Sequence, residues 1–129
     1  MGSQRDVLRG RVAVVTGSTR GLGFAMARLL GQRGATVVLA SRSGVDVAAA
    51  VERLHREGIA ASGRRCDTGE LADVEALRDE ALRRGMLDIW VNNAGASGVT
   101  QGRVPATVVL SRSNAALIKG MSWAIVVRG

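Results

Sequence analysis

The feature that most constrains the fold of this chain is a glycine-rich turn between two segments of different hydrophobic periodicity. Residues 12–16 form an apolar, mostly β-branched run, which is typical of a central strand covered by helices on both faces. From Gly21 onward, apolar residues recur at spacings of three and four, and Gly34 follows as a helix stop. We therefore predict a strand, a tight turn and an amphipathic helix. The predicted apolar stripe of this helix is Leu22, Ala25, Met26, Leu29 and Leu30.

Strands and helices continue to alternate after this unit. A second β-branched run spans residues 36–40 and predicts a strand. A second helix is predicted after it, with Asp46 as its N-cap and Gly58 at its C-terminal end. The apolar stripe of this helix is Val47, Val51 and Leu54.

Two further segments complete the regular pattern. Residues 59–66 predict a weaker strand, because two arginines interrupt it. Asp67 and Glu70 resemble a capping box at the start of a third helix that ends at Gly85, and residues 87–91 predict a fourth strand. The stripe of the third helix is Leu71, Val74, Leu77 and Ala81.

Four strands separated by three helices predict right-handed crossovers and a parallel sheet with helices on both faces. The expected fold class is therefore α/β, a doubly wound (Rossmann-like) parallel sheet. A chain of 129 residues, 47% of them apolar, accommodates one folded domain. We divide this domain into residues 1–95, which carry the pattern, and residues 96–129, an atypical basic tail.

The tail differs from the rest of the chain in charge and in periodicity. The formal net charge is +7, and residues 96–129 contain four basic residues and no acid. These charges are too dispersed along the tail to favour nucleic-acid binding. Residues 104–110 are a candidate fifth strand, although Pro105 turns at least its start into an edge or a loop. Residues 115–127 are compatible with either a helix or a strand.

The glycine-rich turn is a candidate phosphate-binding site because of its position. Glycines at a strand-to-helix turn let the backbone approach a pyrophosphate, which amide donors and the helix dipole then hold. The candidate contacts are Gly17, Ser18, Thr19, Arg20, Gly21, Leu22 and Gly23. The alternative is that these glycines serve tight packing alone.

The spacing Gly-x-x-x-Gly-x-Gly in this turn, together with three further motifs, resembles the short-chain dehydrogenase/reductase (SDR) family. Residues 91–95, Val-Asn-Asn-Ala-Gly, end the fourth predicted strand. Cys66-Asp67 ends the third, and residues 39–42, Leu-Ala-Ser-Arg, end the second. The resemblance covers residues 8–95 and implies that this part binds a nicotinamide dinucleotide.

The resemblance also implies roles for individual residues. The Asp67 side chain and the Thr68 amide would hold the adenine edge, and Asn92 would stabilise the end of its strand by hydrogen bonds. The residues expected beside the adenine-side ribose and the nicotinamide are Asn93, Ala94 and Gly95. Cys66 is predicted to be a buried, inert thiol.

The end of the second strand favours NADP over NAD. A carboxylate at this position accepts hydrogen bonds from the ribose diol of NAD and repels the 2′-phosphate of NADP, whereas this strand ends in Ser41 and Arg42. Arg20 in the glycine turn is expected to converge with Arg42 on that doubly charged phosphate. As an alternative, either arginine is an ordinary solvated surface charge.

The catalytic residues that the resemblance implies are not found. Hydride transfer in the family needs a Tyr acid/base, a Lys four residues later, a Ser and a relay Asn, and these 129 residues contain no tyrosine. One alignment of residues 110–117 puts Leu110 in place of the Tyr and Asn114 in place of the Lys. Two others make Ser111 the catalytic Ser or Asn114 the relay Asn. Because the three exclude one another, we assign no catalytic residue and no metal ligand.

The interval between Gly95 and Leu110 is too short for the helix, strand and active-site loop that the family places there. We therefore expect a truncated or internally deleted member. A gene truncation or frameshift, a natural remnant and an engineered fragment remain open as explanations. The fourth strand would then present an open edge, which should promote self-association unless the tail folds over it.

These observations predict an NADP(H)-binding, SDR-like protein of the oxidoreductase class that is inactive as this chain. The alternative is a non-catalytic interaction module that uses the sheet edge or the tail. No targeting segment is visible, and no uncharged apolar stretch reaches the ~18 residues of a membrane span. The only cysteine, Cys66, cannot form an intrachain disulfide. We expect a cytoplasmic protein whose partner is the dinucleotide.

Overall fold

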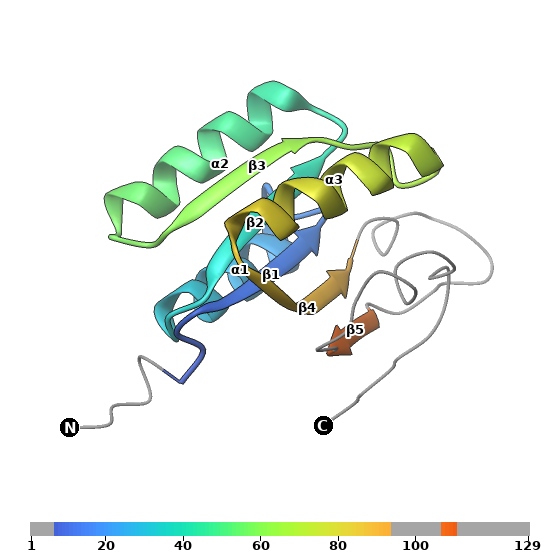
Figure 1. Cartoon of the computed structure of the whole chain (residues 1–129). Helices are drawn as coiled ribbons and strands as arrows, with labels where there is room; N and C mark the ends of the chain where they lie inside the picture. Colours follow the sequence, from blue (N-terminus) through green and yellow to red (C-terminus); the bar gives the residue numbers. More distant parts are fainter. Residues whose placement is uncertain (1–6, 94–106, 111–129) are drawn as a thin grey trace.

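A mixed sheet of five strands, with helices on both of its faces, makes up the part of the chain that the computed structural model describes, residues 7–93 and 107–110 (Figure 1). The predicted four strands and three helices are all present, with ends that shift by a few residues. The elements in chain order are β1 (Arg11–Thr16), α1 (Gly21–Gln32), β2 (Thr36–Ser41), α2 (Gly44–Arg56), β3 (Ala61–Arg65), α3 (Leu71–Arg84), β4 (Met86–Asn92) and β5 (Thr107–Leu110).

The strand order β3-β2-β1-β4-β5 places the first strand at the centre of the sheet. β1 to β4 run parallel, which confirms the predicted doubly wound α/β fold. β5 instead runs antiparallel to β4, with Thr107 opposite Asn92 and Leu110 opposite Ile89. The β4 edge is therefore not open, because β5, which comes from the tail, pairs along it; this is the exception that the sequence-based expectation allowed. Residues 104–106 of the expected fifth strand, and residues 115–127, lie outside the described residues.

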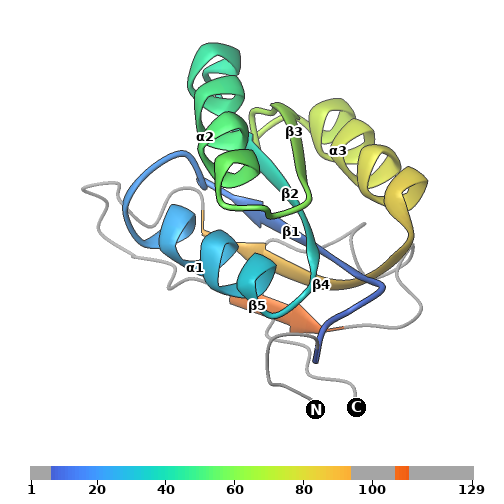
Figure 2. The same ribbon diagram turned by 90° about the vertical axis from the view of Figure 1, so that its left-hand side faces the viewer.

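The helices cover the two faces of the sheet unequally. Figure 2 shows α1 and α2 on one face and α3 on the other. The core under α1 and α2 includes Ala13, Val15 and Leu39, and the core under α3 includes Val14 and Val38. Side chains of β1 and β2 thus alternate between the two cores, as expected for strands buried on both faces. The longest described helix has 14 residues, and none of the described helices is long and apolar enough to cross a membrane.

The predicted stripe of α1 is only partly correct: Met26 and Leu30 pack against the core, but the other three residues are exposed. Leu22 and Leu29 are 64% and 51% exposed, and Ala25 is exposed as well. The buried residues of the helix are Gly23, Phe24 and Ala27. At Gly23 the helix lies so close to the turn that an added Cβ would stand 2.0 Å from the Gly17 carbonyl oxygen. Because of this close approach, the buried face of α1 is centred about one residue away from the predicted face. This corresponds to a rotation of about 100° about the helix axis.

The predicted helix starts also need correction. The N-cap of α2 is Ser43, whose hydroxyl accepts a hydrogen bond from the Asp46 backbone N–H at 3.2 Å, so Asp46 is not the cap. At α3 the N-cap is Glu70, and its side chain makes no capping bond. The capping box is not formed because the Asp67 carboxylate instead accepts from the Gly69 N–H at 2.9 Å. The Asp73 carboxylate accepts from the Asp67 N–H at 3.0 Å.

Candidate functional site

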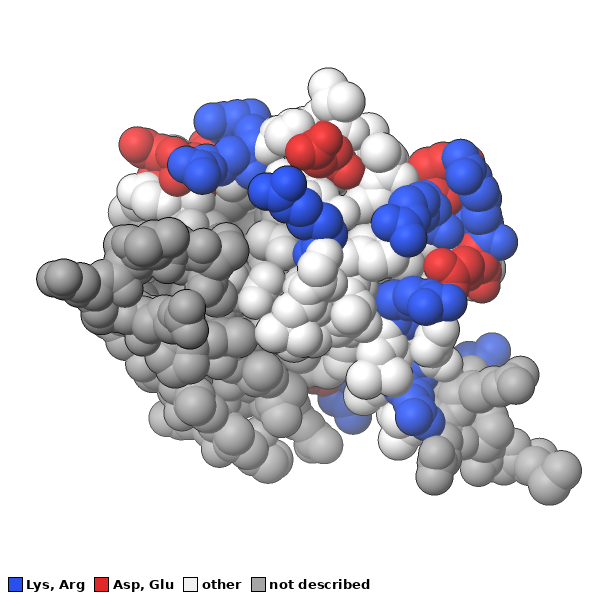
Figure 3. Space-filling model, turned by 180° about the vertical axis from the view of Figure 1, so that it is seen from behind, with Lys and Arg blue, Asp and Glu red and all other residues white. Residues whose placement is uncertain are grey.

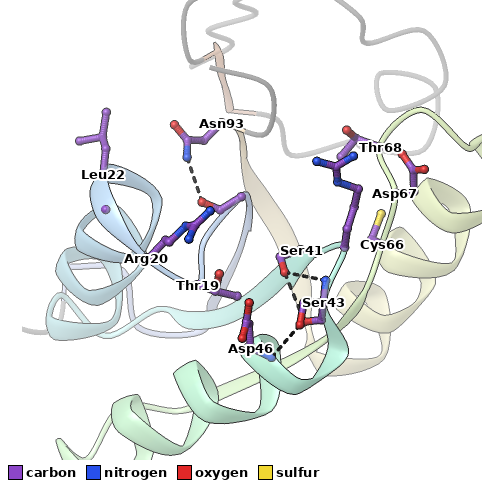
Figure 4. Close-up of a pocket in the computed structure, with 13 residues that line it drawn as sticks. Thr19, Arg20, Leu22, Ser41, Ser43, Asp46, Cys66, Asp67, Thr68 and Asn93 are labelled. Carbon is purple, nitrogen blue, oxygen red and sulfur yellow. Dashed lines mark hydrogen bonds between the residues drawn. The ribbon is translucent and has the colours of Figure 1, made fainter. Parts of the chain in front are cut away.

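A pocket of about 750 Å³ lies at the carboxyl ends of the parallel strands (Figure 4). In a doubly wound sheet, ligands bind at this edge, where the strand order reverses on either side of the first strand. The pocket is lined by Gly17, Thr19, Arg20, Gly21, Leu22, Ser41, Arg42, Ser43, Asp46, Cys66, Asp67, Thr68 and Asn93. Segments after β1, β2, β3 and β4 therefore meet around one space.

The glycine turn shapes one wall of the pocket. Gly17 and Gly21 have φ angles of 60° and 59°, a backbone conformation that other residues rarely adopt. Arg20 is the N-cap of α1 with an extended backbone, and its side chain makes no capping hydrogen bond. No acidic residue occupies the first turn of α1. The amide groups and the positive end of the helix dipole are thus left for an anion.

Two residues of the turn that are predicted contacts also have structural roles. Ser18 is completely buried, and its hydroxyl accepts a hydrogen bond from the Ala40 N–H at 3.0 Å. The Ser18 N–H in turn donates to the Ala40 carbonyl oxygen at 3.2 Å. Gly23 faces the Gly17 carbonyl at close range. Neither residue lines the pocket: Ser18 ties the turn to β2, and Gly23 lets α1 approach the turn.

The end of β4 is joined to the same turn by hydrogen bonds. The Asn93 side-chain amide donates to the Gly17 carbonyl oxygen at 3.0 Å, and its backbone N–H donates to Thr16 Oγ1 at 3.0 Å. Thr16 Oγ1 donates to Asn92 Oδ1 at 3.1 Å, which confirms that Asn92 stabilises the strand end. Asn93 lines the pocket, whereas Ala94 and Gly95 lie outside the described residues.

The turn after β2 brings two basic side chains to the pocket. The Ser41 hydroxyl accepts from the Ser43 N–H at 3.1 Å and donates to the Ser43 carbonyl oxygen at 3.3 Å, which fixes the turn around Arg42. Arg42 and Arg20 are both exposed and line the same pocket. Neither arginine forms an ion pair with another residue of the described part of the chain. Their charges are available to a ligand.

The residues after β3 form the opposite wall. The Cys66 N–H donates to the Ser41 carbonyl oxygen at 2.8 Å, so this wall is fastened to the end of β2. Burial raises the pKa of the Cys66 thiol, and the carboxylates of Asp73 and Asp67 raise it further. The thiol is buried, as predicted, and a raised pKa disfavours the reactive thiolate. Asp67 and Thr68 both line the pocket.

Sequence reasoning missed three lining residues, Ser43, Asp46 and Cys66. Ser43 has a local signal, because a serine three residues before an acid is a common helix start. Asp46 has no such signal, since its position in the pocket depends on how α2 is rotated against the sheet. Cys66 was expected to be buried, and the pocket reaches it at the end of β3.

Fold and site together define a doubly wound α/β protein with a glycine turn at the strand switch point. The family model of the short chain dehydrogenases matches residues 11–118, which is most of the chain. The protein therefore belongs to the SDR family of oxidoreductases.

Three similar proteins illustrate the relationship. Human dehydrogenase/reductase SDR family member 4 is 45% identical over 93 residues, covering 71% of this chain and 34% of its own. Actinorhodin polyketide ketoreductase, solved as a variant with NADPH, has a TM-score of 0.66 at 36% identity, covering 76% of this chain and 36% of its own. An SDR from Burkholderia phymatum in complex with NAD has a TM-score of 0.58 at 36% identity, covering 60% and 28%.

The chain thus spans about a third of the length of these relatives. The two complexes show that members of the family bind nicotinamide dinucleotides, in one case NADPH and in the other NAD.

Proposed function

We propose that this chain binds NADP(H) in the pocket at the carboxyl ends of its strands, as the cofactor-binding part of an SDR oxidoreductase. One observation carries the preference for NADP(H) over NAD(H): Arg20 and Arg42 line the same pocket and pair with none of the acids that the structure describes. Guanidinium groups donate several hydrogen bonds to one phosphate and stay charged at all physiological pH values.

The residues present fit the parts of a dinucleotide. The pyrophosphate would lie at the N-terminus of α1, where Gly17 and Gly21 let the backbone approach it. The adenine edge would lie beside Asp67 and Thr68, and the adenosine 2′-phosphate between Arg20 and Arg42. Asn93 would stand on the nicotinamide side. When bound, the cofactor would supply the hydride for a reduction.

We propose in addition that the 129 residues bind the cofactor without turning it over. The family resemblance requires a tyrosine acid/base, and the sequence contains none. A site that binds the cofactor but has no proton donor for the transition state gives cofactor affinity without acceleration of hydride transfer. Incubation of the protein and NADPH with a panel of ketones and quinones checks this, and a robust rate of NADPH oxidation would disprove it.

Calorimetric titration with NADPH and NADH tests the proposed cofactor. We expect NADPH to bind more tightly, and Arg42→Ala to weaken NADPH binding by about tenfold because a charged hydrogen-bond donor is lost. NADH binding should change little. Arg56→Ala is the matched control, since Arg56 is 72% exposed in its side chain and, among the described residues, pairs with Glu52 on the same helix, at 3.6 Å. A folded protein that takes up neither coenzyme would refute the proposal.

The alternative of a non-catalytic interaction module has less support. The β4 edge that motivates it is paired with β5, so the edge strands of the described sheet are β3 and β5. Figure 3 shows acidic side chains interspersed among the basic ones on one face of the described chain, instead of a continuous basic patch. Ion pairs such as Arg28 to Glu57, at 2.6 Å, neutralise part of the charge. Self-association stays a proposal. We also propose a cytoplasmic location, because the only cysteine is a free, buried thiol and free thiols suit a reducing compartment.

A further inference from the structure

Two acidic side chains line the same pocket as the two arginines. Asp67 accepts a hydrogen bond from the Gly69 N–H at 2.9 Å, and the other acid is Asp46. Figure 4 shows its carboxylate rising from the first turn of α2 in the direction of Thr19 in the glycine turn. The helix start does not use this carboxylate, because Ser43 is the N-cap and only the backbone N–H of Asp46 takes part. Nor does it form an ion pair with any residue in the ranges that the structure describes.

The position of Asp46 is fixed by packing of the neighbouring residue. Val47 is buried, and it lies so close to β3 that an added Cβ on Gly63 would stand 2.6 Å from Val47 Cγ1. Ala50 and Leu54 are buried on the same face of α2. Because successive helical residues are separated by about 100°, a fixed Val47 also fixes the direction of Asp46. The rotation of α2 thus places the Cβ of Asp46 on the pocket side, and its exposed side chain is one of those that line the pocket.

We infer that Asp46 is a specificity-determining residue, whose negative charge in the pocket lowers the preference of this chain for NADP(H) over NAD(H). This inference rests on the proposed function. The two coenzymes differ only by the 2′-phosphate, which carries a charge of about −1.5 to −2 near neutral pH if it titrates like other phosphate monoesters. Repulsion between Asp46 and the shared pyrophosphate affects both coenzymes alike, whereas repulsion of the 2′-phosphate affects NADP(H) alone. Arg20 and Arg42 therefore act against an opposing charge that the pocket itself contains.

Asp46 also has a plausible structural role, since an acid in the first turn of a helix stabilises the helix dipole. The two roles differ in what they change. A loss of helix stability would weaken the binding of both coenzymes to a similar extent. Removal of a repulsive charge would strengthen NADPH binding selectively, and salt would reduce the gain because it screens exposed charges.

The test is calorimetric titration of the whole chain and its Asp46→Asn variant with NADPH and NADH at low and high salt. Asn keeps the size of the side chain and the capped N–H. We expect NADPH to bind about three to ten times more tightly to the variant at low salt, with NADH binding changed less than about twofold. Glu52→Gln is the matched control, because it removes one charge from the same helix at a position outside the pocket. It should leave the ratio of NADPH affinity to NADH affinity unchanged.

Each outcome of this experiment is decisive. Wild-type protein that takes up neither coenzyme overturns the proposed function and the inference together. A second outcome is that the wild type binds a coenzyme but the ratio of NADPH affinity to NADH affinity is unchanged or lowered in Asp46→Asn. This outcome overturns the inference alone. If Asp46→Asn does not fold, Asp46→Ser provides the same measurement, since serine is also accepted in the first turn of a helix.

Discussion

The side-chain amide of Asn93, at the end of β4, donates a hydrogen bond of 3.0 Å to the carbonyl oxygen of Gly17, in the turn after β1. Gly23 at the start of α1 lies against both groups: an added Cβ would stand 2.0 Å from the Gly17 oxygen and 2.6 Å from the Asn93 amide nitrogen. The glycine turn and the start of α1, which are neighbours in sequence, are thereby held together with the distant end of β4 at one wall of the pocket. The shape of the proposed phosphate site depends on all three.

We expect Asn93→Ala to weaken both the fold and the site. The Gly17 carbonyl oxygen loses its side-chain donor, which should lower the free energy of unfolding by about 1 kcal/mol. NADPH affinity should fall by several fold, because the turn is no longer held by β4. Urea denaturation and calorimetric titration measure the two effects. Gln32→Ala, at the exposed end of α1, serves as the control. Wild-type values in both measurements would show that this hydrogen bond does not shape the site.

Gly23→Ala should be far more damaging than its size suggests. The added methyl group meets backbone atoms of Gly17, which cannot move as a flexible side chain would. We expect a loss of about 1–3 kcal/mol in unfolding free energy, typical of overpacking, together with loss of NADPH binding. Gly44→Ala is the matched control, since its nearest neighbour, Arg65 Cβ, would be at an ordinary 3.8 Å. Equal thermal midpoints for the two variants would contradict this prediction.

The Cys66 thiol should react slowly in the folded protein. Its pKa is raised, first by burial and then by the Asp73 and Asp67 carboxylates, so little thiolate forms at pH 8. We expect iodoacetamide to modify it at least about tenfold more slowly than in the chain unfolded in urea. The modification is followed by mass spectrometry, and similar rates in the two states would contradict burial of the thiol.

The same raised pKa predicts a pH dependence of stability. The folded state favours the neutral thiol, so this contribution is fully present below the thiol pKa of the unfolded chain, about 8.5. The contribution is lost as the pH rises through the higher pKa of the folded state. The unfolding free energy, measured from pH 7 to 10 in urea, should therefore fall more steeply for the wild type than for Cys66→Ala. Parallel curves would exclude the effect.

The packing of α2 can be tested at Leu54, whose side chain is completely buried. Truncation in Leu54→Ala leaves a cavity under the helix and should lower the free energy of unfolding by about 2–5 kcal/mol. Val45→Ala, on the same helix but 81% exposed, should change it by less than about 0.5 kcal/mol. Chemical denaturation of the two variants provides the comparison, and similar losses would mean that α2 is not packed as described.

The sequence by itself determined the succession of strands and helices along the chain and the location of the candidate site. Hydrophobic periodicity and turn glycines are local properties, so the run of residues 12–16 and the glycines after it predict a strand, a turn and a helix without knowledge of the rest. The carboxyl ends of parallel strands necessarily meet at one edge, which is why the motifs after each strand predicted one common site. Ten of the fourteen predicted contacts line the pocket.

Only the tertiary structure decided the rotation of α1, the antiparallel return of β5 along β4 and the place of Asp46 in the pocket. Each depends on contacts between distant segments: Gly23 against Gly17 and Asn93, β5 against β4, and Val47 against Gly63. Close packing at such contacts fixes a helix rotation to within one residue, whereas a local hydrophobic pattern tolerates a neighbouring rotation with little change. For this reason an acid assigned to a helix cap lies in the pocket instead.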